Sequence, residues 1–182
     1  MLSLSSLAGW EDAVLASIAG ASGTPEERYV QIERSGMYGE YPAILRAYAE
    51  LFDDPACVVE AVKRAVFLVW RGAMASPDVT GLAALPESTS RDVIARLDDV
   101  IRHGLADDEL AWMMAWYRAG GAFLFDLLGG TPSVQRFGAD RGPEAWRQAG
   151  ITADRMRTRG QLGRYWTALA AGVVPENTSG AP

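Results

Sequence analysis

The stretch that decides the fold is residues 107–128, DDELAWMMAWYRAGGAFLFDLL. Asp107 is at the start of this stretch, and Asp108 and Glu109 follow it in the first turn of the expected helix. A helix N-terminus favours negative charge at these positions. At 100° per residue, apolar side chains surround the whole axis, so we predict a helix buried at the centre of the protein. Small residues form a flank that a neighbouring helix can approach closely, and Gly120-Gly121 is the expected place for a bend. These small residues are Ala111, Ala115, Ala119 and Ala122.

A membrane-spanning helix is the alternative interpretation, because residues 110–128 have nearly the required length. Arg118 and Asp126 oppose it, since each would cost several kcal/mol in lipid. The other segments also have polar faces. We therefore expect no membrane partner.

Helix start and stop signals divide the remaining chain, and no stretch alternates with the period of a strand. We predict an all-α fold, a compact multi-helix bundle of about seven to eight helices around the buried central helix. Thr24-Pro25-Glu26-Glu27 is the clearest start signal, a capping box with proline at the first helical position. The first expected helix begins at residue 7 or 10 and ends at 19, and the others span 42–52, 55–73, 90–103 and 152–171, with short segments after 132 and 143.

Length and composition indicate one domain. A chain of 182 residues is long enough for a single core, and we assign residues 1–173 to it. We expect residues 174–182 to form a flexible tail. The start of the chain lacks a basic region followed by a long apolar run, and Cys57 is the only cysteine, so we expect a cytoplasmic protein.

The net charge of −6 is unevenly distributed. Residues 136–164 hold seven arginines against three acids, a local charge of +4, which leaves −10 on the remaining residues. The two regions could meet charged partners, pair head to tail between copies, or neutralise each other within the fold. Trp146, Tyr165 and Trp166 could stack on bases, but the apolar face of the last helix uses such aromatics for packing. We therefore expect no nucleic-acid partner.

No signature motif of an enzyme is present, so the catalytic residues, if any, are unknown. Acids and the single histidine cluster at residues 98–109 and could hold a metal ion, but they also occupy helix ends where their charges are favourable. We expect no metal and no cofactor. Cys57 lies near a helix N-terminus, and its sequence context favours a small core residue over a nucleophile.

The ligand-binding candidates are Arg118, Asp126, Trp112 and Trp116, all on the helix at 107–128. Arg118 and Asp126 lie about 80° and about 12 Å apart by helical geometry, so each needs a partner other than its neighbour. Those partners are either structural side chains or a polar ligand.

The interface candidates are Tyr38, Tyr41, Phe67 and Arg71. Tyr38 and Tyr41 lie in a glycine-flanked turn. Phe67 is expected to point outward from a polar face that carries Glu60, Lys63, Arg64 and Arg71, and aromatics beside arginine are typical of interface anchors.

The sequence therefore predicts a non-enzymatic cytoplasmic helical protein that binds another protein or itself. The alternative is a small-ligand binder or enzyme. Its pocket would lie between the helix at 107–128, the helix at 55–73 and the long connection at 74–89.

Overall fold

The computed structural model describes residues 2–83 and 85–173, and the tail predicted at 174–182 lies outside these residues. The predicted all-α fold is confirmed, and no strand occurs in the described part of the chain. Within the same residues, none of the helices combines the length and the apolar content needed to cross a bilayer. The longer helices are α1 (Leu4–Ala19), α2 (Pro25–Arg34), α3 (Glu40–Ala49), α4 (Val58–Met74), α6 (Glu87–Arg102), α7 (Asp108–Leu127) and α10 (Gly160–Ala170). The short ones are η1 (Met37–Gly39), α5 (Pro77–Thr80), α8 (Pro132–Arg136), η2 (Pro143–Gln148) and α9 (Ala153–Met156).

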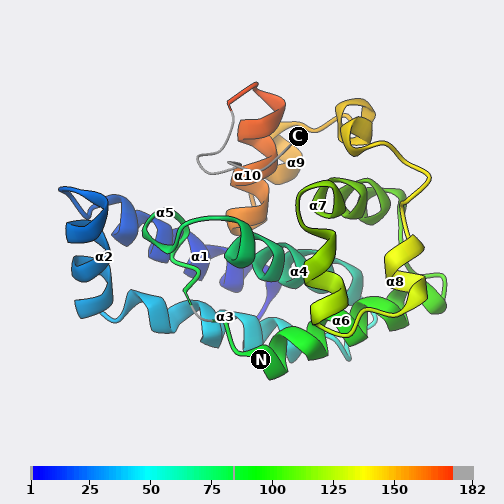
Figure 1. The fold of residues 1–182 in the computed structure, drawn as a ribbon, viewed down its shortest axis with the longest axis horizontal. Helices are drawn as coiled ribbons and strands as arrows, with labels where there is room; N and C mark the ends of the chain where they lie inside the picture. Colours follow the sequence, from blue (N-terminus) through cyan, green and yellow to red (C-terminus); the bar gives the residue numbers. More distant parts are fainter. Residues whose placement is uncertain (1, 84, 174–182) are drawn as a thin grey trace.

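Helix α4 lies at the centre of the bundle. It packs against α3, α6, α7 and α10, and Figure 1 shows α7 and α10 on one side of it and α3 and α6 on the other. Its residues are buried without a break from Ala61 to Arg71. The sequence explains this position in part, because Ala65-Val66-Phe67-Leu68-Val69-Trp70 is the most continuous apolar run of the helix.

Helix α7 is buried on all sides only in its N-terminal half, where residues 110–115 are all buried. The prediction of full burial is wrong for the C-terminal half, since Phe123 and Leu127 are exposed. The expected bend at the glycine pair is confirmed: Gly121 has non-helical dihedrals of φ −162° and ψ 42°. A Cβ there would lie 3.0 Å from Met74 Cε, the flexible end of a side chain of α4, so an added side chain would require this methionine to move.

The predicted capping box at the start of α2 is present. Glu27 N–H donates to Thr24 Oγ1 at 3.3 Å, and Thr24 N–H donates to Glu27 Oε2 at 2.8 Å. The first helix begins at Leu4, earlier than predicted, because the Ser3 hydroxyl accepts the N–H of Ser6 at 3.1 Å and caps it.

The connection after α4 contains α5, and the buried side chain of Leu82 anchors it. The single last helix predicted at 152–171 is wrong, because two helices, α9 and α10, cover this region. Gly160, the first residue of α10, is in the left-handed region (φ 56°), a conformation that a side chain disfavours and that redirects the chain.

Candidate functional site

An apolar groove of about 310 Å³ opens beside the C-terminal half of α7. Four parts of the chain line it: α4, the connection after α5, the start of α6 and the end of α7. This is where the sequence placed a pocket. The lining residues are Val69, Gly72, Ala73, Leu82, Leu85, Glu87, Ser90, Leu124, Leu127 and Leu128.

Two large apolar side chains of α7 are exposed near this groove: Leu127 lines it, and Phe123 lies one helical turn earlier. Phe123 is 61% exposed and Leu127 is 64% exposed, and they are four residues apart, on successive turns of one helix face. Ala119 and Ala122 are also exposed, so small side chains flank the phenyl ring. We call the groove together with Phe123, Leu127, Ala119 and Ala122 the α7 face. It is an exposed apolar patch of the kind that marks binding sites.

The rim of the α7 face carries charges of both signs. Arg91 Nη2 and Glu87 Oε1 form an ion pair of 2.8 Å, and Asp126 Oδ1 accepts a hydrogen bond from Gln135 Nε2 at 2.8 Å. All four side chains lie near the surface, where such interactions contribute little to stability. They remain free to reorganise around a partner.

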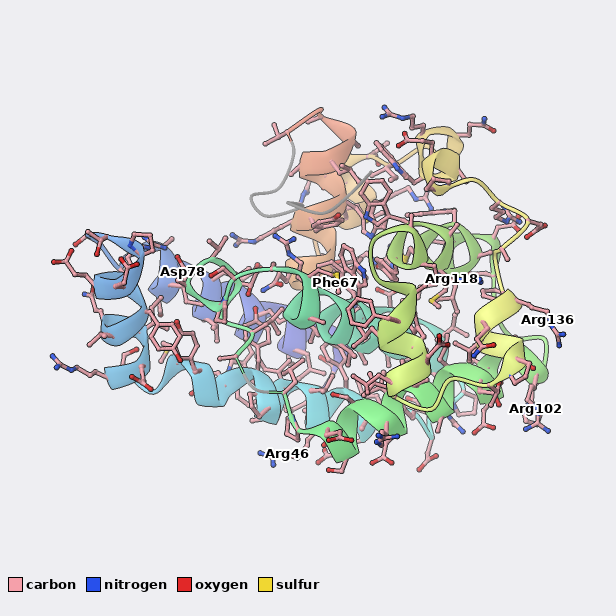
Figure 2. The ribbon with its side chains drawn as sticks, viewed as in Figure 1. Arg46, Phe67, Asp78, Arg102, Arg118 and Arg136 are labelled. Carbon is pink, nitrogen blue, oxygen red and sulfur yellow. The ribbon has the colours of Figure 1, made fainter. Side chains whose placement is uncertain are left out.

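The ligand candidates do not converge on the groove. Arg118 Nη1 donates to the backbone oxygen of Phe137 at 3.2 Å, so both Arg118 and Asp126 bind the segment that follows α7. Figure 2 shows Arg118 on α7, away from Arg136 at the outer end of α8. The two charges do not pair with each other, as the helical spacing predicted, and protein groups satisfy them. Neither residue lines the groove.

Trp112 and Trp116 belong to an aromatic cluster between α4, α7, η2 and α10. The Trp112 ring meets Trp166 edge to face at 4.5 Å, and Trp116 Nε1 donates to the hydroxyl of Tyr165 at 2.8 Å. Trp146 lies in the same cluster, edge to face with Trp116. These aromatic rings therefore pack the core.

Three of the interface candidates are buried, so their expected exposure is wrong. Tyr41 and Phe67 are fully buried, Arg71 is nearly so, and Figure 2 shows Phe67 in the interior of the bundle. Arg71 lies over the ring of Tyr165, with Cζ 5.2 Å from the centroid. The physical reason is that other helices surround α4, including the polar face that suggested contact with solvent. Tyr38 alone is half-buried, and its ring packs on the exposed Tyr29 with the centroids 5.1 Å apart.

Ion pairs explain the polar face of α4. Arg159 holds two carboxylates at once: its Nη2 lies 2.5 Å from Glu60 Oε2, and its Nη1 lies 2.9 Å from Glu109 Oε1. Lys63 Nζ lies 2.7 Å from Glu109 Oε2 and 2.6 Å from Asp107 Oδ2. The network joins α4, α7 and the N-cap of α10. No local sequence signal could reveal it, because Arg159 and Glu60 are 99 residues apart.

The network changes the acidity of Glu109. Burial by itself would raise the pKa of this carboxyl, but hydrogen bonds and charges from Arg159 and Lys63 outweigh burial and lower the pKa to about 2. Glu109 is therefore ionised throughout the physiological pH range, and its ion pairs hold the helices together across that range.

The arginine-rich region is neutralised within the fold, one of the three alternatives that the charge pattern left open. Six of its seven arginines pair with acids. Arg141 reaches Asp108 at 2.6 Å, and Arg164 reaches Asp12 at 2.8 Å. The aromatics Trp146, Tyr165 and Trp166 are buried, which leaves no stacking platform among these three.

The acids around residues 98–109 serve structural contacts. Thr131 Oγ1 donates to Asp98 Oδ1 at 2.5 Å, and the backbone N–H of Leu110 donates to Asp107 Oδ1 at 2.9 Å, which confirms Asp107 as a helix cap. Among residues 2–83 and 85–173, no group of three or more acidic, histidine or cysteine side chains is arranged to hold a metal ion. Burial raises the pKa of the Cys57 thiol above its ordinary value, which opposes reactivity.

No family model matches the chain, and searches among curated proteins and solved structures also give no match. The α7 face is therefore the candidate site on physical grounds alone. Phe123 and Leu127 were not among the site candidates predicted from the sequence, which placed both on a buried helix. The Gly120-Gly121 pair was the available signal, because a bend can turn the second half of a helix out of the core.

Proposed function

We propose that the protein acts through protein–protein contact, and that the partner at the α7 face is a second copy of the chain. The observation that carries this proposal is self-complementarity. Leu127 lines the apolar groove, and Phe123 projects one helical turn away from it on α7. A two-fold interface requires this combination, because each copy must present both the projecting group and the surface that receives it.

The chemistry of the two sides matches. The phenyl ring of Phe123 would enter a groove lined largely by leucine and valine side chains, and the small side chains of Ala119 and Ala122 permit close approach of a second helix. Charges of both signs on the rim allow Glu87 or Asp126 of one copy to face Arg91 of the other.

The dimer is expected to be weak. Full burial of a phenylalanine or leucine side chain contributes about 1.5–3 kcal/mol, and Phe123 and Leu127 are already partly covered. Association costs roughly 4–15 kcal/mol in lost freedom of motion. The two sums are comparable, so the net affinity is small, and we expect the dimer to form only at high protein concentration.

Sedimentation velocity over a wide range of concentrations tests the proposal. The wild-type protein should shift towards twice the monomer mass, and Phe123→Glu should stay monomeric. Leu105→Glu is the matched control, because Leu105 is 53% exposed in the connection between α6 and α7, beyond the other end of α7. It should dimerise like the wild type. A wild-type chain that remains monomeric at several hundred micromolar, or equal effects of the two substitutions, would refute the proposal.

A small apolar ligand in the groove is the second candidate. The groove volume of about 310 Å³ lies at the lower end of the range for ligand sites, and its lining is mainly apolar. Native mass spectrometry of the untagged protein separates the two candidates. A bound small mass on the monomer supports a ligand, and a doubled mass supports the dimer.

We also propose a cytoplasmic location, which the free thiol of Cys57 supports.

A further inference from the structure

A buried carboxyl group, that of Glu11, lies beneath the start of α10. The residue belongs to α1 and is only 1% exposed. Its Oε2 accepts the backbone N–H of Gln161 at 2.7 Å, and its Oε1 accepts the hydroxyl of Tyr48 at 2.5 Å. Glu11 and Gln161 are 150 residues apart, so this contact joins the first helix to the last.

The backbone is shaped around this carboxyl. Gly160 is left-handed (φ 56°), and a Cβ there would lie 2.7 Å from Glu11 Oε2. Glycine therefore lets the first turn of α10 sit directly on the acid. The Gln161 side chain anchors the same turn, because its Nε2 donates to Tyr41 Oη at 2.7 Å and to Thr80 O at 2.9 Å.

Helix α10 contributes buried side chains to the core, so its attachment affects the packing of the neighbouring helices. Leu162, Tyr165 and Trp166 of this helix are buried, and Trp166 contacts the rings of Trp112 and Tyr117. Displacement of α10 would therefore open the aromatic cluster between α4 and α7.

The surroundings of Glu11 supply hydrogen bonds but little opposite charge. In the described part of the chain, no lysine or arginine lies within ion-pair distance of its carboxyl. The other groups that face it are Tyr41 and Tyr48 from α3, Arg64 from α4, and Asp12, which pairs with Arg164 of α10.

Burial is the dominant influence and raises the pKa of Glu11 from 4.5 to about 7. The hydrogen bonds from Tyr48 and Gln161 and the charge of Arg64 lower the pKa but do not outweigh burial, and Asp12 adds to the rise. The N-terminus of α10 also favours the ionised form. The carboxyl is thus poised to change charge near neutral pH.

We propose that Glu11 is a proton-controlled latch on α10. In the docked, neutral form the acid's proton is held between Glu11 Oε1 and Tyr48 Oη while Oε2 keeps the bond from the Gln161 N–H, and ionisation favours the undocking of the first turn. When α10 undocks, water reaches the carboxylate, and the cost of enclosing a charge between α1, α3 and α10 disappears. This proposal is independent of the α7 face.

Hydrogen exchange measured by mass spectrometry tests the latch. The observable is the opening equilibrium of residues 157–170, corrected for the intrinsic pH dependence of exchange. A carboxyl with a pKa of about 7 when docked and 4.5 when open predicts an increase of about 40-fold in opening between pH 5 and pH 7, which levels off above pH 8.

Glu11→Gln should abolish this increase, because an amide cannot ionise. Asp12→Asn is the matched control, since the neighbouring acid pairs with Arg164 at the surface, and it should retain the increase. A pH dependence that survives in Glu11→Gln, or that disappears in Asp12→Asn, would overturn the proposal.

Tyr48→Phe provides a second test that does not alter the acid. Loss of the hydroxyl removes a hydrogen bond that lowers the pKa of Glu11, so opening should level off at a higher pH than in the wild type. An unchanged profile would also contradict the latch, even if Glu11→Gln failed to fold.

Discussion

Two phenylalanines give the most direct test of the architecture, because the same substitution at Phe67 and at Phe123 should have very different effects on stability. Phe67 is 0% exposed. Its ring centroid lies 5.4 Å from that of Tyr165, 6.2 Å from that of Trp70 and 6.4 Å from that of Tyr117. Phe123 is 61% exposed. The residue types match, so the comparison isolates burial.

Phe67→Ala should lower the free energy of unfolding by about 3–5 kcal/mol, the usual cost of removing a buried phenyl ring. The upper part of this range is expected. The surrounding rings come from α4, α7 and α10 and cannot all move inward to fill the cavity, and aromatic pairs each contribute about 0.5–1.5 kcal/mol beyond their buried area. Phe123→Ala should cost less than about 1 kcal/mol, because its ring is already mostly in water.

Urea unfolding followed by circular dichroism measures both changes. The protein concentration should stay below one micromolar, so that dimer formation does not contribute to the stability of the wild type. The midpoint of Phe67→Ala should fall with little change in the urea dependence. Equal losses in the two variants, or a loss below about 1.5 kcal/mol for Phe67→Ala, would refute a central position for α4.

Two further predictions concern acid groups and backbone. The folded-state pKa of Glu11 is raised from 4.5 to about 7, so its contribution to stability is present below pH 4.5 and is lost, by about 3 kcal/mol, as the pH rises to 7. The pKa of Glu109 is lowered to about 2, so its contribution is present above pH 4.5 and is lost as the pH falls to 2. Thermal unfolding therefore tests Glu11→Gln across this range: between pH 4.5 and 7 the variant should lose only the stability that other titrating groups remove. A loss of stability equal to that of the wild type would contradict the raised pKa of Glu11. Gly138→Ala should destabilise more than Gly36→Ala. Both glycines are left-handed, but a Cβ at Gly138 would lie 2.4 Å from a backbone oxygen of α7, whereas the one at Gly36 meets open space. The left-handed conformation alone costs about 1–2 kcal/mol, and equal losses in calorimetry would show that the clash is relieved.

Local sequence determined the helices and several of their ends. The capping box at Thr24 and Glu27, the cap at Asp107 and the kink at Gly121 were all predictable. Each depends on groups within a few residues of one another or on a glycine pair inside a helix, and such features leave their signature in the sequence. The groove lies between α4, α7 and the connection after α4, the elements between which the alternative interpretation placed a pocket.

Only the tertiary structure decided which helix is central and what the charged residues do. Phe67 appeared to lie on a surface because charged residues surround it along α4. In the fold, one of these, Lys63, pairs with Glu109 of α7, and another, Glu60, pairs with Arg159, so the polar face is enclosed. A pattern of polar and apolar residues predicts which face of a helix is polar, but it cannot show whether water or an opposite charge from a distant segment covers that face. The contact of Glu11 with Gln161 has the same origin, because only folding brings residues 150 positions apart together.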